Sequence, residues 1–254
     1  MAASGQSLHY KIVGHGPDLI LLHGFLESSS IWDDLIHRMK NDFRIIAIDL
    51  PGHGSSASIG PVCTMQKMAD EVQEVLEKEH ISQARFMGHS MGGYVLLALL
   101  DSAPKLFEGL ILLNSTTRAD SQDRIKTREQ ALRLLEHNKT RYLSNAIKNL
   151  FATEDQAHFV EAIDGLVAQA TSFSTQGISA AIRGMMERKD HSYTLQQFKG
   201  NKHAISGKRD PLLSPAHNVQ WTEESQTPLS VLDCGHMAWL EKPSEIVKIV
   251  HFIE

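Results

Sequence analysis

The chain contains 254 residues, with 25 basic side chains against 30 acidic ones, so its formal net charge is −5. This length fits one large α/β unit, alone or with an insertion, and such a chain folds without disulfides or a structural metal. No strong positive field is present to hold phosphate backbones, so nucleic acid is excluded as an expected partner.

Cysteine usage and the distribution of apolar residues bear on the compartment. Cys63 and Cys234 lie far apart and form none of the paired spacings of a zinc site or a disulfide framework. They suit a reducing compartment, so we expect a cytoplasmic protein. Residues 1–7 show no basic segment followed by an apolar run, so no signal peptide is predicted. Every apolar run falls short of the ~18 residues of a membrane-spanning helix, and no membrane association is expected.

Short apolar runs recur along the chain and predict strands buried on both faces, as in a parallel sheet covered by helices. An edge strand over residues 7–13 comes first and ends in a turn at Gly14, Gly16 and Pro17. Buried strands are then expected at residues 19–22, 45–48, 85–87, 110–113, 204–205 and 229–232. The alternation of these runs with helical segments indicates an α/β fold.

Two helices of this core have recognisable first residues. Thr64 is expected to cap a helix whose apolar stripe begins at Met65, because its hydroxyl can accept a hydrogen bond from a free backbone amide. Pro243 suits the first position of a C-terminal helix, where no backbone donor is needed. Both helices are expected to turn an apolar face toward the sheet.

The strand signal disappears between residues 116 and 199, where four helical patterns follow one another. The first is expected to start at Asp120, and the third at Thr153, with Gln156 completing a capping box. This segment carries 12 basic and 10 acidic residues, a net charge of +2 against −7 elsewhere. We expect a four-helix lid at residues 116–199, inserted into a core of residues 1–115 and 200–254. The alternative is that these helices simply extend the core.

The most specific local motif is Gly-His-Ser-Met-Gly-Gly at residues 88–93, which lies between a predicted strand and a helical stretch. A Gly-x-Ser-x-Gly sequence at such a junction predicts a nucleophile elbow, a tight turn that raises the hydroxyl of Ser90 above the sheet. The helix that follows points backbone amides and its positive dipole end at any anion formed there. The alternative is a glycine-rich turn that only joins a strand to a helix.

Four further segments accompany this motif in a recognisable order: His-Gly-Phe at 23–25, Asp-Leu-Pro-Gly-His-Gly-Ser at 49–55, Gly-Lys-Arg-Asp at 207–210, and Gly-His at 235–236. Together they resemble the α/β-hydrolase fold family over essentially the whole chain. The resemblance implies a mainly parallel, eight-stranded sheet flanked by helices, with a lid after the sixth strand. The first strand would be short, because residues 1–5 leave little chain for it.

The resemblance also implies roles for individual residues. A serine hydroxyl needs a neighbouring base, and that base needs an orienting group. In the family the acid and then the histidine follow the serine in the chain, which points to Asp210 as the acid and His236 as the general base for Ser90. Asp233 is the alternative acid, but it lies only three residues before His236 on the same strand end.

The same resemblance implies an oxyanion hole made by the backbone NH groups of Phe25 and Met91. Two other conspicuous side chains near these motifs, His23 and His53, are expected to organise loops by hydrogen bonding. Cys234 is expected to be a packing residue. No metal or cofactor is expected, because the chain has no His-x-x-x-His pair, no cysteine pair and no glycine-rich loop ending in Gly-Lys-Ser/Thr.

These observations predict a serine hydrolase that cleaves small-molecule carboxylic esters through an acyl-enzyme on Ser90. By the resemblance, a serine rather than an aspartate nucleophile argues against dehalogenases and epoxide hydrolases. Lactone opening, carbon–carbon bond hydrolysis, thioester cleavage and perhydrolysis remain open, as do a hydrolase-fold ligand receptor and the oligomeric state. Phe159, Met185 and Met186 suggest an apolar acyl group, whereas the positive charge of the expected lid permits an anionic substrate.

Overall fold

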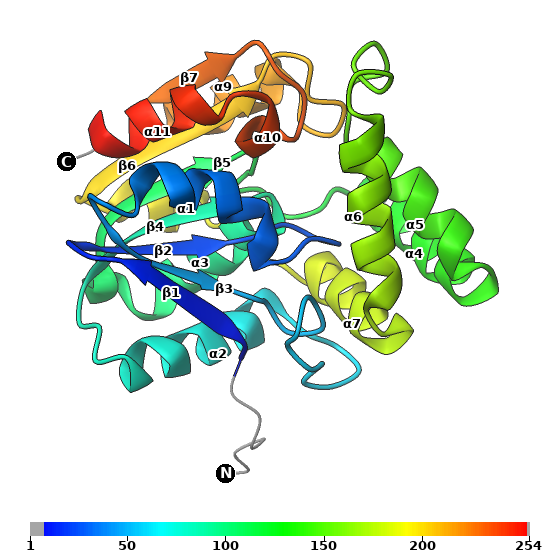
Figure 1. The fold of residues 1–254 in the computed structure, drawn as a ribbon, viewed down its shortest axis with the longest axis horizontal. Helices are drawn as coiled ribbons and strands as arrows, with labels where there is room; N and C mark the ends of the chain where they lie inside the picture. Colours follow the sequence, from blue (N-terminus) through cyan, green and yellow to red (C-terminus); the bar gives the residue numbers. More distant parts are fainter. Residues whose placement is uncertain (1–7, 253–254) are drawn as a thin grey trace.

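A single twisted sheet forms the centre of the computed structural model, which describes residues 8–252 (Figure 1). The sheet has seven strands in the order β1-β3-β2-β4-β5-β6-β7. Only the pair β1–β3 is antiparallel, and the other neighbouring strands run parallel. The strands are β1 (Tyr10–Gly14), β2 (Asp18–Leu22), β3 (Arg44–Ile48), β4 (Ala84–His89), β5 (Phe107–Leu113), β6 (Asn201–Gly207) and β7 (Leu229–Leu232).

The described residues thus contain seven strands rather than the eight that the resemblance implied. The short first strand expected within residues 1–5 lies outside the described residues. Each predicted strand is present, but several are longer than their apolar runs. β6, for example, begins with the exposed Asn201 and becomes fully buried only from Ala204 onward. An apolar run marks only the buried part of such a strand.

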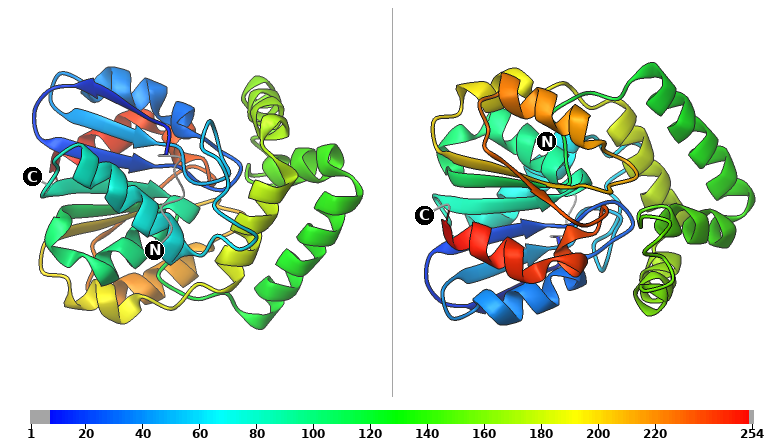
Figure 2. Two further views of the ribbon diagram at one scale, coloured as in Figure 1. Left: turned by 90° about the horizontal axis from the view of Figure 1, so that it is seen from below. Right: turned by 90° about the horizontal axis from the view of Figure 1, so that it is seen from above.

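Helices cover both faces of the sheet, as Figure 2 shows. One face carries α1 (Asp33–Met39) and α11 (Pro243–Phe252), which pack against each other. The opposite face carries α2 (Met65–Lys78), α3 (Met91–Ser102), α8 (Ser192–Gln197) and α9 (Pro215–Glu224). The short elements η1 (Ser29–Trp32), η2 (Pro104–Leu106) and α10 (Ala238–Glu241) lie in connections. None of the helices among residues 8–252 is long and apolar enough to cross a membrane.

The predicted starts of two core helices are confirmed. The hydroxyl of Thr64 accepts a hydrogen bond from the Lys67 amide at 3.2 Å, at the first turn of α2. Pro243 is the first residue of α11.

The segment between β5 and β6 contains only helices and loops among residues 114–200: α4 (Gln122–His137), α5 (Lys139–Lys148), α6 (Val160–Ser172), α7 (Thr175–Met186) and α8. We call α4–α7 the helical insertion. Its helices stand beyond the edge of the sheet where the parallel strands end (Figure 1). α8 was not predicted from the sequence; it is a helix of one to two turns that packs against α3 of the core.

Two predicted helix starts in this insertion are wrong. Ser121, not Asp120, caps α4, because its hydroxyl accepts from the Arg124 amide. The expected capping box of Thr153 and Gln156 is absent, and α6 begins at residue 160 without a side-chain cap. Gln156 instead donates to the carbonyl oxygens of residues 148 and 151, which closes the end of α5.

Candidate active site

Ser90 lies at the apex of the tight turn between β4 and α3. Its backbone has φ 49° and ψ −112°, a conformation that residues with a side chain rarely adopt. Two glycines permit this turn. A Cβ atom on Gly88 would lie 2.6 Å from the carbonyl carbon of Gly92, and one on Gly92 would lie 2.3 Å from the carbonyl oxygen of Leu22. The turn therefore has the shape expected of a nucleophile elbow.

Hydrogen bonds from β5 and from the residues after it hold this turn in place. The Ser90 amide donates to the Leu113 carbonyl at 2.9 Å, and the Ser115 hydroxyl donates to the Ser90 carbonyl at 2.8 Å. The amide nitrogens of Met91 and Phe25 have no hydrogen-bond partner within residues 8–252. Both of the NH groups expected to form the oxyanion hole are therefore free to donate to a ligand oxygen.

Asp210 and His236 follow β6 and β7 and meet in the interior. Asp210 Oδ2 lies 2.7 Å from His236 Nδ1, and both side chains are buried. The other carboxylate oxygen accepts from the amides of Leu212 and Leu213 at 2.8 and 3.0 Å. Burial alone would raise the pKa of Asp210, but the charge and hydrogen bond of His236 outweigh it and the pKa is lowered. The carboxylate therefore stays ionised and accepts the Nδ1 proton.

Asn114 completes this arrangement, although the sequence analysis did not identify it. Its side-chain amide donates to Asp210 Oδ2 at 2.9 Å and to the Gly235 carbonyl at 3.2 Å. It thus joins the acid to the loop that carries His236. The signal available in the sequence was its position directly after the strand predicted at residues 110–113. In the structure its backbone has φ 44°, which asparagine tolerates better than most residues.

The alternative acid, Asp233, has a different environment. Its side chain is 71% exposed and pairs with Arg209, not with His236. Its neighbour Cys234 is buried, and burial raises the pKa of its thiol to about 12. These observations favour Asp210 over Asp233 and agree with a packing role for Cys234.

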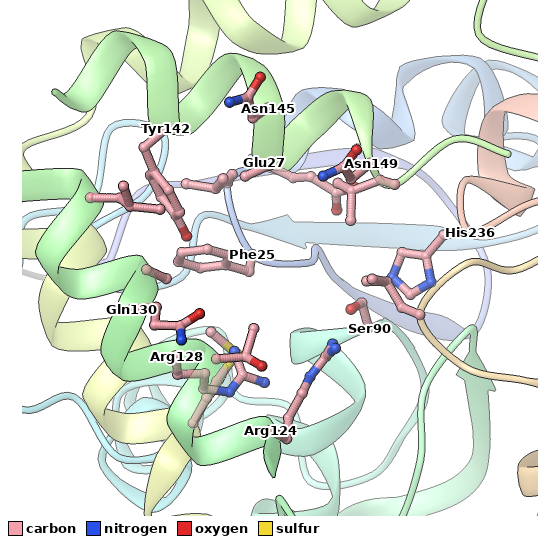
Figure 3. Close-up of a pocket in the computed structure, with 18 of the residues that line it drawn as sticks. Phe25, Glu27, Ser90, Arg124, Arg128, Gln130, Tyr142, Asn145, Asn149 and His236 are labelled. Atoms are coloured by element: carbon pink, nitrogen blue, oxygen red, sulfur yellow. The ribbon is translucent and has the colours of Figure 1, made fainter. Parts of the chain in front are cut away.

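Ser90 and His236 line one cavity of about 680 Å³ (Figure 3). The Nε2 atom of His236 is buried and makes no hydrogen bond within the described residues, so no bond to Ser90 is formed here. Catalytic hydrogen bonds are often long or absent in ligand-free structures and tighten with substrate. Because Asp210 holds Nδ1, Nε2 is the ring position left to accept a proton.

The helical insertion forms the opposite wall of this cavity, through residues of α4 and α5 such as Leu134 and Tyr142. Of the three insertion residues expected to line it, only Met185 does so. Phe159 and Met186 are absent from the lining, and the Phe159 ring packs on Phe151 with 5.6 Å between centroids. Helical periodicity places residues on a common face but does not identify what that face contacts.

His23 organises the loops near the cavity, as expected. It accepts from the Leu50 amide through Nε2 at 2.9 Å, and its Nδ1 lies 2.7 Å from the Gly24 carbonyl. This combination requires the neutral ring with the proton on Nδ1. Burial lowers the pKa of His23, which agrees with that neutral state.

His53 is also fully buried, and its ring packs edge-on against Phe25 and Phe173 with centroids 5.7 and 5.6 Å away. Burial and the nearby His23 lower its pKa to about 3. The unfolded chain takes up this proton below pH ~6.5, whereas the folded protein does not until about pH 3. Acidification across this window therefore favours unfolding by about 1.4 kcal/mol per pH unit from this group alone.

A His53→Phe variant tests this linkage. It should be less stable than the parent at pH 7, by about 1 kcal/mol for the lost hydrogen bond to the Pro51 carbonyl. As the pH falls from 6 to 4, this difference in the free energy of unfolding should shift in favour of the variant by up to ~1.4 kcal/mol per unit, so that it vanishes and then reverses. Urea unfolding at pH 7, 6, 5 and 4 provides the measurement. Parallel stability curves for the two proteins would contradict a buried, neutral His53.

A second pair of ionisable side chains, Glu27 and His89, lies under the cavity and was not identified from the sequence. His89 Nδ1 lies 2.9 Å from Glu27 Oε2, and His89 Nε2 lies 2.9 Å from the His236 carbonyl. The same carboxylate oxygen accepts from the Gly24 amide at 2.6 Å. Burial alone would lower the pKa of His89, but the charge and hydrogen bond of Glu27 outweigh it and the pKa is raised. The pair thus connects the loop that bears Phe25 to the loop that bears His236.

Glu27→Gln should lower the free energy of unfolding by about 3–5 kcal/mol, because it leaves His89 buried without its counter-charge. Chemical denaturation at pH 7 measures this loss. Glu245→Gln is the matched control, since Glu245 pairs with Lys248 on the surface and its loss should cost under ~1 kcal/mol. Equal effects of the two substitutions would show that the buried pair does not stabilise the fold.

Among residues 8–252, no group of three or more His, Cys, Asp or Glu side chains is arranged to hold a metal ion.

Known proteins resemble this chain both in sequence and in structure. The model of the alpha/beta hydrolase fold family matches residues 17–243. A pimeloyl-[acyl-carrier protein] methyl ester esterase of Nitrosomonas europaea is 27% identical over 95% of this chain and 97% of its own. A thermophilic esterase from Thermogutta terrifontis, solved with malate bound, superposes with a TM-score of 0.91 at 25% identity, covering 98% and 94% of the chains. An enol-lactonase from Burkholderia xenovorans LB400 shares the fold, with a TM-score of 0.89 at 21% identity and coverage of 98% and 97%.

Proposed function

The chain belongs to the α/β hydrolase fold family, and on this premise we propose that it is a serine hydrolase that cleaves small-molecule carboxylic esters. The observation that carries this proposal is the shared cavity of Ser90 and His236, with the imidazole held by the buried Asp210 at 2.7 Å. Esterases among its relatives support the reaction class.

In the proposed mechanism the Ser90 hydroxyl attacks the ester carbonyl carbon while Nε2 of His236 accepts its proton. The carbonyl oxygen becomes an oxyanion, and the NH groups of Phe25 and Met91 donate hydrogen bonds to it. His236 then returns the proton to the departing alcohol as the bond between acyl carbon and alkoxy oxygen breaks. Asp210 holds Nδ1 throughout and stabilises the imidazolium.

Hydrolysis of the acyl-enzyme repeats these steps with water. His236 Nε2 takes a proton from the water, whose oxygen attacks the acyl carbon, and the oxyanion returns to the same NH groups. Collapse of the intermediate releases the acid and returns the proton to Ser90. Asn114 supports both halves by holding Asp210 and the Gly235 carbonyl in place.

We further infer that residues 116–199 act as a lid inserted into a core of residues 1–115 and 200–254. The position of α4 and α5 across the cavity from Ser90 supports this role. The lid is anchored at its C-terminal end, because α8 packs on α3 and the Cys63 amide of the core donates to the Ala180 carbonyl of α7 at 3.0 Å. The free, buried cysteines support a reducing compartment such as the cytoplasm.

A substrate panel tests the proposed reaction. An ester, a lactone, a thioester and a vinylogous diketone acid with matched acyl groups are compared by kcat/KM, together with p-nitrophenyl esters from acetate to octanoate. We expect multiple turnover and the highest kcat/KM with the open-chain ester. Faster opening of the lactone, or faster cleavage of the diketone or thioester, would reassign the reaction. A single, slow acylation with tight ligand binding would favour a receptor.

A further inference from the structure

We propose that Arg124 binds a carboxylate group of the substrate, so that the enzyme prefers esters that carry a second, ionised carboxyl group. This inference rests on the proposed ester hydrolysis and adds the substrate class. It is carried by the position of Arg124, by its lack of a partner and by the charge of its surroundings.

Arg124 lies in the first turn of α4 and lines the same cavity as Ser90 and His236. Figure 3 shows its side chain extending from α4 toward Ser90. Within residues 8–252, the guanidinium makes no hydrogen bond and no ion pair, although the side chain is partly buried. A guanidinium removed from water without an acceptor is unfavourable, so its donors are available to a ligand.

The neighbouring Arg128 and Arg188 differ from Arg124 because they share a carboxylate as their counter-ion. The side chain of Asp120 is fully buried and pairs with Arg128 Nε and Arg188 Nη1, each at 2.5 Å. One carboxylate thus faces two arginines, and Arg124 adds a third positive charge. Burial lowers the pKa of Arg124, and the charge of Arg128 lowers it further. The guanidinium nevertheless remains charged at neutral pH. An anion in the cavity would offset this excess of positive charge.

The only carboxylate in the described cavity lining is that of Glu27. It does not neutralise Arg124, because it is held by His89 and by the Gly24 amide. The polar side chains on the insertion side of the cavity are uncharged amides and hydroxyls, apart from arginines and a histidine. This wall therefore attracts a negative group and has no acid of its own to compete with it.

A carboxylate is the anion that one free guanidinium fits, because two parallel N–H donors match its two oxygens. An arginine can also bind a phosphate group bidentately, so the phosphate arm of the test distinguishes the two anions. The cavity of about 680 Å³ has room for a reacting ester beside Ser90 and a second carboxyl group on the insertion side. Gln130 and Asn145, which also line this cavity, add uncharged hydrogen-bond donors.

The test compares charged and neutral esters of equal length. Monomethyl esters of linear dicarboxylic acids place the carboxylate on the acyl side, and acyl esters of hydroxy acids place it on the alcohol side. Methyl and alkyl esters of the same chain length are the neutral partners, and an ester with a terminal phosphate provides the third arm. The kcat/KM of each ester is measured with the parent, Arg124→Met, Arg124→Lys and Arg133→Met. Arg133 is the control position, because it is exposed on the same helix and does not line the cavity.

We expect the parent to prefer one of the two carboxylate series over its neutral partner. Arg124→Met should lower kcat/KM for that series by about 10- to 100-fold, mainly through KM, because it loses a charge-assisted hydrogen bond. Neutral esters should change less than about threefold, Arg124→Lys should retain part of the preference, and Arg133→Met should behave as the parent. Arg124→Met should unfold at the same or a higher urea concentration, because it removes an unpaired, partly buried charge.

Equal losses for charged and neutral esters, or marked destabilisation of Arg124→Met, would show a structural arginine and overturn the proposal. A parent that prefers the phosphate arm, or no charged arm, would overturn it as well. Calorimetric titration of adipate into Ser90→Ala, with and without Arg124→Met, reports binding without chemistry. Binding that depends on Arg124 in a protein that cleaves no ester would leave the carboxylate site intact and reject the proposed hydrolysis alone.

Discussion

Ser90→Ala is expected to lower kcat/KM for p-nitrophenyl esters by about 10⁴- to 10⁶-fold. Without the hydroxyl there is no nucleophile to form the acyl-enzyme, and only the oxyanion hole and substrate binding remain. The turn itself should survive, because its hydrogen bonds to the Leu113 carbonyl and from the Ser115 hydroxyl involve only the backbone of residue 90. Steady-state hydrolysis measured by p-nitrophenolate release provides the rate.

Ser144→Ala is the matched control, since Ser144 is exposed on α5 and does not line the cavity. It should keep the parent activity within about twofold. Circular dichroism spectra and urea midpoints show whether each variant is folded. A folded Ser90→Ala protein with more than a tenth of the parent activity would exclude Ser90 as the nucleophile.

Asp210→Asn should reduce kcat by up to about 10⁴-fold while the protein remains folded. The parent carboxylate accepts the Nδ1 proton of His236, which leaves Nε2 free to act as a base. An asparagine amide can instead donate to Nδ1, and this favours the tautomer with its proton on Nε2. That ring cannot accept the proton of Ser90, so the base is lost without any change in size at position 210.

Asp233→Asn separates the two candidate acids. Asp233 is exposed and pairs with Arg209, so its loss should change kcat less than about twofold. Parallel measurements of kcat and KM at pH 7.5 compare the two variants. An almost fully active Asp210→Asn protein beside an inactive Asp233→Asn protein would transfer the orienting role to Asp233.

The parts of the fold that are predictable from the sequence are those recorded in short segments of the chain. Strands of a buried parallel sheet appear in the sequence as apolar runs, and the helix starts at Thr64 and Pro243 depend on residues within one turn. The turn at Ser90 is predictable because it needs glycines at fixed neighbouring positions. The contact between Asp210 and His236 joins loops 26 residues apart, so no local pattern predicts it. Their roles were predicted from the order of these residues in the family.

The remaining features depend on contacts between distant segments. Glu27 meets His89 across 62 residues, and Asn114 reaches Asp210 across 96, so no local pattern marks either pair. Thr153 and Gln156 have the spacing of a capping box, but the Gln156 side chain donates instead to the Lys148 carbonyl at the end of α5. The lack of a partner for Arg124 is apparent only once Asp120 is seen to pair with two other arginines.

Covalent labelling tests the central claim, that Ser90 is a nucleophile activated by His236, most directly. The parent, Ser90→Ala and Asp210→Asn are incubated with a fluorophosphonate, and the modified residue is located by peptide mass spectrometry. We expect one adduct per chain on Ser90 of the parent, none on Ser90→Ala, and much slower labelling of Asp210→Asn. An adduct on another residue, or equal labelling of the parent and Ser90→Ala, would contradict it.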